Sequence, residues 1–136
     1  MSQGRVAAIV VLMALGIVSA DEIVIEPRTL HLGRPGQFEW EAFKDRKVDA
    51  ERLELRFEAK TSATEQTLRI WQRDVKLAWP VLLNGRRLGT LTTAETPQEA
   101  VFTVPPAALK AGENVLTIQA PSGLDDIEAG PVILDS

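Results

Sequence analysis

The segment TLRIWQR, residues 67–73, carries the side chains best suited to recognition chemistry. Its aliphatic residues alternate with Arg69, Trp71 and Arg73, so a strand here places these three on the face opposite the core. An indole flanked by guanidinium groups can stack on a sugar ring while the arginines donate to its hydroxyl groups. We therefore predict Arg69, Trp71 and Arg73 as ligand-binding residues. The alternative is a covered face on which the arginines pack against Trp71 through cation–π contacts.

Two adjacent carboxylates, Asp125 and Asp126, form the candidate metal site. Calcium takes about six to eight oxygen ligands, which carboxylates and backbone carbonyls supply together. The EF-hand pattern is absent from the sequence. The alternative is an acidic turn that caps the final strand. A structural calcium at Asp125 and Asp126 is thus one expectation, and no other cofactor is expected.

Side chains for catalysis are scarce. His31 is the only histidine and the chain has no cysteine, so neither a catalytic triad nor a thiolate site is indicated. No serine lies in a G-x-S-x-G elbow. We predict that the protein is not an enzyme. Glycoside hydrolysis needs only two suitably placed carboxylates, so a hydrolase stays as a third alternative. His31 lies in a turn-rich segment and is interpreted as a solvated surface histidine.

The first twenty residues have the layout of a secretory signal peptide. Arg5 precedes an apolar run, and the residues VSA before Asp21 are small enough for cleavage. The run is shorter than the roughly 20 residues that a membrane span needs, which favours cleavage over an uncleaved anchor. A chain that is exported yet lacks cysteine fits a bacterial periplasm or exterior. We predict a signal peptide over 1–20 and one secreted or periplasmic domain over 21–136.

The charge of the mature part limits its partners. The whole chain has 15 basic and 19 acidic residues. Only Arg5 lies in the leader, which leaves 14 basic residues against 19 acidic ones, a net charge of −5. Nucleic acid and anionic membranes both demand a basic surface, so we expect neither as a partner.

The mature sequence alternates apolar and polar residues and is interrupted by turn residues, a pattern typical of short strands. We predict an all-β fold, an antiparallel β-sandwich or jelly roll of about eight or nine short strands. A strand over Gln37–Phe43 would place Phe38 and Trp40 on one face, and Trp40 is expected in the core. The other expected strands are residues 22–27, 52–59, 67–73, 76–83, 86–91, 100–104, 115–119 and 130–134.

One hairpin is predicted in detail. Asn84-Gly85 separates two apolar runs, and both residues tolerate the positive φ that a type I′ turn requires. A two-residue turn here places Val81 opposite Leu88. Trp79 then shares the apolar face of the hairpin, so we expect Trp79 in the core.

The hairpin WPVLLNGRRLGTL (79–91) and the later segment LKAGENVLTI (109–118) together resemble galactose-binding-like jelly rolls, including the sugar-binding domain of family 2 glycoside hydrolases. In that domain an Asn-Gly, Leu-Gly hairpin is followed by an L-x-x-G-E-N-x-L-x-I strand. The wider strand pattern resembles accessory domains at the start of larger secreted bacterial proteins. The resemblance implies the fold. It assigns no ligand-binding residue, because its glycines and asparagine serve turns and its leucines serve packing.

Two functions remain open from the sequence. The first is an exported, non-catalytic binding module for a carbohydrate, with the contact at Arg69, Trp71 and Arg73. The second is a structural or docking domain that binds another protein or a catalytic domain. Solvent exposure of Trp71 favours the first, and an exposed apolar patch of a few hundred Å² favours the second.

Overall fold

The strands form where apolar residues recur at every second position. In the segment 53–59, for example, Leu53, Leu55 and Phe57 are buried while Glu54 and Arg56 between them are exposed. The computed structural model describes residues 5–6 and 22–135. Its elements are β1 (Arg5–Val6), β2 (Glu22–Glu26), β3 (Leu30–Leu32), a 3₁₀ turn η2 (Glu41–Phe43), β4 (Leu53–Ala59), β5 (Gln66–Arg73), β6 (Pro80–Leu83), β7 (Arg86–Thr90), β8 (Gln98–Val104), β9 (Gly112–Ile118) and β10 (Ile127–Asp135).

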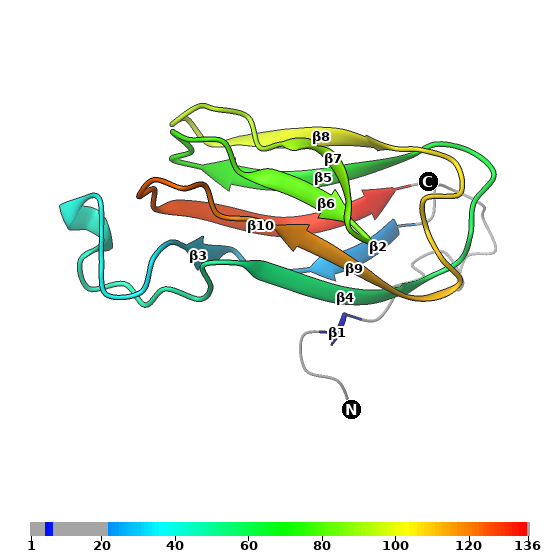
Figure 1. The fold of residues 1–136 in the computed structure, drawn as a ribbon, viewed down its shortest axis with the longest axis horizontal. Helices are drawn as coiled ribbons and strands as arrows, with labels where there is room; N and C mark the ends of the chain where they lie inside the picture. Colours follow the sequence, from blue (N-terminus) through cyan, green and yellow to red (C-terminus); the bar gives the residue numbers. More distant parts are fainter. Residues whose placement is uncertain (1–4, 7–21, 136) are drawn as a thin grey trace, which may run out of the picture.

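These strands build two sheets packed face to face (Figure 1). One sheet has the order β1-β4-β9-β6-β7 and the other has the order β2-β10-β5-β8, with β3 pairing to the start of β10. All the strand pairs are antiparallel except β1 with β4. The all-β sandwich predicted from the sequence is therefore confirmed.

The core lies between the two sheets and is built from the inward residues of both. Trp79 is 1% exposed, which confirms its predicted place in the core. Burial of such side chains is the main favourable term for a fold of this kind. The largest fully buried apolar side chains are Trp79, Phe57, Ile25, Leu32, Leu68, Ile70, Leu91, Leu116, Ile118, Ile127 and Val75.

The predicted hairpin joins β6 to β7. Asn84 has φ 51° and Gly85 has φ 82°, the positive values that the predicted turn requires. The predicted register is wrong beyond the first two pairs. Val81 pairs with Gly89, because a bulge between the pairs of Val81 and Leu82 leaves Leu88 as an extra residue in β7.

The segment between β3 and β4 differs most from the predictions. Residues 37–43 do not form a strand: they are a loop that ends in η2. A carboxylate oxygen of Asp126 accepts the backbone N–H of Glu39, so this donor is satisfied without a neighbouring strand. Trp40 is 47% exposed, so its predicted place in the core is wrong. The predicted surface position of His31 is also wrong, because β3 forms around it and leaves it 3% exposed.

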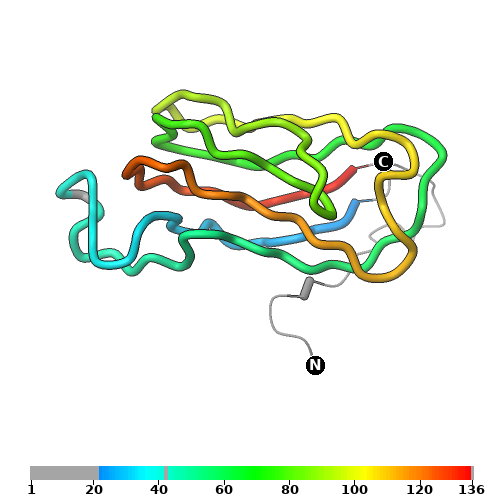
Figure 2. Tube along the Cα trace, in the orientation of Figure 1, coloured from blue at the N-terminus to red at the C-terminus, as the bar shows by residue number. Residues whose placement is uncertain are grey.

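Four loops gather at one end of the sandwich, which is called the loop end below. They span residues 33–52, 74–79, 91–97 and 119–126, and the first of them projects farthest beyond the sheets (Figure 2). The described part of the chain contains no helix long and apolar enough to span a membrane. The predicted signal peptide lies outside the described residues, apart from β1.

Candidate functional site

The outward residues Arg69, Trp71 and Arg73 of β5 share one face of the β2-β10-β5-β8 sheet, as predicted. Their inward neighbours Leu68 and Ile70 are 1% and 0% exposed, whereas these three side chains are partly exposed. The set Arg69, Trp71 and Arg73 is called the β5 face below. Strand alternation alone therefore placed Trp71 correctly on the outer side of the sandwich.

All three nitrogens of the Arg69 guanidinium group donate to carboxylates on other strands of the same sheet. Its Nε donates to Asp135 over 2.6 Å and its Nη1 donates to Glu99 over 2.9 Å. Its Nη2 donates to Glu22 over 3.4 Å. The hydrogen bond to Asp135, together with the nearby negative charges, raises the pKa of Arg69 although partial burial opposes the shift. Three carboxylates around one arginine leave this face rich in hydrogen-bond acceptors.

The rest of the β5 face is also paired. Arg73 Nε lies 3.0 Å from Glu128 Oε1 and 3.3 Å from Asp74 Oδ2. Trp71 lies opposite Glu99 on β8. Trp71 is thus the uncharged member of the β5 face. The arginines on either side of it contact carboxylates and do not stack on its ring.

Buried carboxylates organise the loop end. Asp125 is 2% exposed, and its Oδ2 accepts hydrogen bonds from the backbone N–H groups of Lys76 and Leu77 at 3.0 and 2.9 Å. The same oxygen accepts from Trp79 Nε1 at 3.0 Å. One side chain therefore ties the loop 74–79 and the core tryptophan to the start of β10.

Asp126 does the same for the longest loop. Its Oδ1 lies 2.9 Å from His31 Nε2, and the other ring nitrogen of His31 lies 3.0 Å from the carbonyl oxygen of Lys47. Each ring nitrogen of His31 therefore lies within hydrogen-bond distance of an oxygen atom. A Cβ on Gly33 would lie 2.3 Å from Asp126 Oδ1, so only glycine leaves room for this pair.

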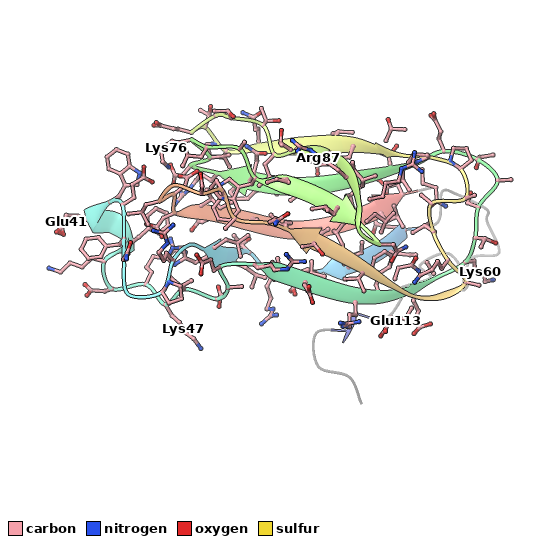
Figure 3. All side chains as sticks on the ribbon, in the orientation of Figure 1. Glu41, Lys47, Lys60, Lys76, Arg87 and Glu113 are labelled. Carbon is pink, nitrogen blue, oxygen red and sulfur yellow. The ribbon has the colours of Figure 1, made fainter. Side chains whose placement is uncertain are left out.

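Lys76 connects these carboxylates to an exposed aromatic ring. Its Nζ lies 3.1 Å from Asp125 Oδ1, 3.1 Å from Glu39 Oε1 and 5.7 Å from the centre of the Trp40 ring. Burial lowers the pKa of Lys76, but the hydrogen bonds to Asp125 and Glu39 and their charges outweigh it and raise the pKa overall. Figure 3 places Lys76 and Glu41 together at this end.

The exposed aromatic residues of the loop end were missed as site candidates. Phe38 is 45% exposed and Trp40 is 47% exposed, the largest exposed fractions among the described aromatic side chains. The sequence offered one signal: Pro35-Gly36 directly before them marks a turn rather than a strand. Loops at a fixed end of a scaffold are common places for binding residues.

The candidate calcium residues are both buried here. Their carboxylates accept hydrogen bonds from N–H donors, as described above. Within residues 5–6 and 22–135, no group of three or more histidine, aspartate or glutamate side chains could hold a metal ion. Calcium at Asp125 and Asp126 stays a prediction.

No family model and no curated protein match this sequence. Among solved structures, the chain is similar to a family 35 carbohydrate-binding module from an environmental isolate, with 16% identity and a TM-score of 0.46 over 83% of this chain and 87% of that one. A CBM36-1 domain of a xylanase from the hindgut metagenome of Trinervitermes trinervoides shares 12% identity, with a TM-score of 0.42 over 81% of this chain and 97% of that one.

The GH26-CBM35 β-(1,4)-mannanase of Podospora anserina shares 15% identity with a TM-score of 0.45. The match covers 82% of this chain and spans only 27% of the mannanase chain. The two-sheet sandwich itself fits the galactose-binding-like fold that the hairpin of residues 79–91 resembles.

Proposed function

We propose that this chain is an exported, non-catalytic carbohydrate-binding module. The observation that carries the proposal is that the aromatic rings of Phe38 and Trp40 are nearly half exposed. Their loop is held by the buried His31–Asp126 contact and by the partly exposed Lys76–Glu39 ion pair. A rigid apolar platform beside a few polar groups is what a sugar ring needs for stacking and orientation.

Two surfaces are proposed as contacts. The β5 face, with Arg69, Trp71 and Arg73, is the surface predicted from the sequence. Its acceptor-rich surroundings suit the hydroxyl groups of a neutral sugar stacked on Trp71. The second surface is the loop end around Trp40, whose ring is more exposed than that of Trp71.

The non-catalytic part of the proposal is supported by how the polar groups are used. His31 is committed to Asp126 and to the carbonyl of Lys47, which leaves neither ring nitrogen for proton transfer to a substrate. A polysaccharide-hydrolysis assay tests this part, and release of reducing ends that disappears when Glu99 or Glu128 is changed to glutamine would contradict it.

Retention on a glycan array tests the proposed binding and separates the two surfaces. The mature chain is compared with Trp71→Ala, Trp40→Ala and Leu77→Ala. Leu77 is the matched control, because it is 37% exposed at the loop end and has no ring to stack. We expect one tryptophan variant to lose retention by about tenfold or more, while Leu77→Ala binds normally. Absence of retention for the unaltered chain on every glycan would contradict the proposed function.

Calcium and export are tested alongside. If Asp125 and Asp126 hold a calcium ion that binding requires, a chelator added to the array abolishes retention. Mass spectrometry of the secreted or periplasmic protein is expected to find a chain that begins at Asp21, and a retained residue 1–20 segment would contradict the cleaved leader.

A protein-docking domain is the second candidate. Val101 of β8 is 63% exposed and pairs with Arg69, so it extends the β5 face with an apolar side chain. If this face docks to a catalytic domain, Val101→Asp prevents co-purification with that domain and leaves glycan retention unchanged. Loss of glycan retention in the same variant would instead assign the surface to carbohydrate.

A further inference from the structure

A groove of ≈ 430 Å³ opens within the loop 33–52. Its lining includes Phe38, which is 45% exposed, and Phe43, which is 3% exposed. The charged residues that line it are Lys44, Arg46 and Lys47, so every charge in the lining is positive. In a mature chain with a net charge of −5, this is a local reversal of sign.

The positive charge of the groove is only partly neutralised. Arg46 Nη1 lies 2.6 Å from Glu128 Oε2, yet the Arg46 side chain remains 40% exposed. Within residues 22–135, no ion pair involves Lys44 or Lys47, and both residues are exposed. Two ammonium groups and one guanidinium edge are thus available to an anion.

The groove is formed before any ligand arrives. The backbone N–H groups of Phe43, Lys44 and Arg46 donate to the carbonyl oxygens of residues 40, 41 and 43 over 2.9, 3.0 and 3.1 Å. The Phe43 ring stacks on buried His31 at 4.7 Å, and the guanidinium of Arg46 lies 5.2 Å from the same ring. Because the groove is already ordered, little of the binding free energy is lost to ordering its residues.

We propose that this groove binds a sugar unit that carries a carboxylate or sulfate group. The inference rests on the proposed carbohydrate-binding function and names its ligand class. Phe38 offers the apolar surface for the sugar ring, and Lys44, Arg46 and Lys47 offer charge-assisted hydrogen bonds to the anionic group. A neutral sugar would need acceptors as well, and no carboxylate lines the groove.

Binding of the mature chain to a soluble polyuronate tests the inference, measured by calorimetry at low and at high salt. The same polymer with its carboxylates reduced to alcohols is the neutral comparison, and a sulfated polysaccharide distinguishes the two sources of negative charge. The variant is Lys44→Glu with Lys47→Glu. The control makes the same charge change at Lys60 and Lys110, which are exposed lysines outside the groove, and Figure 3 shows Lys47 and Lys60 at opposite ends of the molecule.

We expect the chain to bind the polyuronate or the sulfated polymer more tightly than the reduced one, and more weakly as salt rises. The Lys44/Lys47 variant should lose about tenfold or more in affinity, while the Lys60/Lys110 control stays within about twofold. Unchanged melting temperatures show that both variants are folded.

Three results would overturn the inference. The first is that the chain binds the charged and the reduced polymer with equal affinity. The second is that the Lys44/Lys47 variant and the Lys60/Lys110 control lose the same amount of affinity. The third is that the chain binds an acidic peptide but neither anionic polymer. If the chain retains neutral glycans on the array but no anionic one, the inference fails and the proposed function stands. If it retains no glycan at all, the proposed function fails as well.

Discussion

The β5 face and the loop end both bring charged side chains next to a tryptophan, but they are held in different ways. On the β5 face, strand pairing fixes the backbone, and Arg69 and its carboxylates lie on top of it, partly open to solvent. At the loop end, the backbone has few strand partners, and buried Asp125 and Asp126 supply the missing acceptors. The sheet thus positions its side chains, whereas side chains position the loops.

This difference predicts unequal costs for removing polar groups. A buried carboxylate that satisfies several N–H donors leaves all of them unpaired when it is lost. A partly exposed ion pair leaves groups that water can solvate.

Asp125→Ala should lower the free energy of unfolding by about 3–5 kcal/mol, because it leaves three N–H donors without their acceptor, one of them the buried Trp79 Nε1, and leaves Glu39 as the remaining carboxylate partner of Lys76. Urea unfolding at neutral pH measures the loss. Asp125→Asn is the control, because its amide keeps one oxygen acceptor and should lose less. A loss below about 1 kcal/mol for the alanine variant would show that the carboxylate does not hold the loops.

Gly33→Ala should lower the free energy of unfolding by about 2 kcal/mol or more, because the new methyl group would lie 2.3 Å from Asp126 Oδ1 and force the His31–Asp126 pair apart. Gly123→Ala is the comparison, since its Cβ meets only the end of the Leu77 side chain at 2.9 Å, which can turn away. Thermal unfolding of both variants checks the prediction, and equal shifts in melting temperature would speak against a tight pair.

Lys76→Gln should lower the free energy of unfolding by about 1 kcal/mol below pH 10. The difference in free energy of unfolding between the variant and the unaltered chain should shrink at higher pH. The folded-state pKa of Lys76 is raised, so its contribution is fully present below the unfolded pKa of about 10.4 and is lost as the pH rises through the folded value. Urea unfolding of both chains at pH 9 and pH 11 measures the gap. A gap that widens with pH would contradict the sign of the shift.

Arg69→Met should lower the free energy of unfolding least, by about 0.5–1 kcal/mol, because the Arg69 side chain is 28% exposed and water screens the carboxylates that remain. The cost should change with added salt, since the ion pairs lie near the surface. Urea unfolding at low and high salt gives both values. A salt-independent loss as large as that of Asp125→Ala would remove the distinction between the two regions.

The candidate site was predictable where local periodicity decides it. Trp71 belongs to a strand in which every second residue is buried, so its outward position follows from its neighbours in sequence. Trp40 also alternates with acidic residues, and the same argument assigned it wrongly to a core strand. Its segment has no sheet to join, and Asp126, far along the chain, holds the loop in place instead.

Local chemistry determined the strands of the two sheets and the Asn84-Gly85 turn, because alternation and positive φ depend on residues within a few positions of one another. The tertiary structure alone decided that His31 is buried and Trp40 exposed. The partner of His31 is Asp126, 95 residues away, and no local pattern carries information about such a contact. Burial of a polar group follows from the partner that satisfies it, and here that partner is supplied by a distant part of the chain.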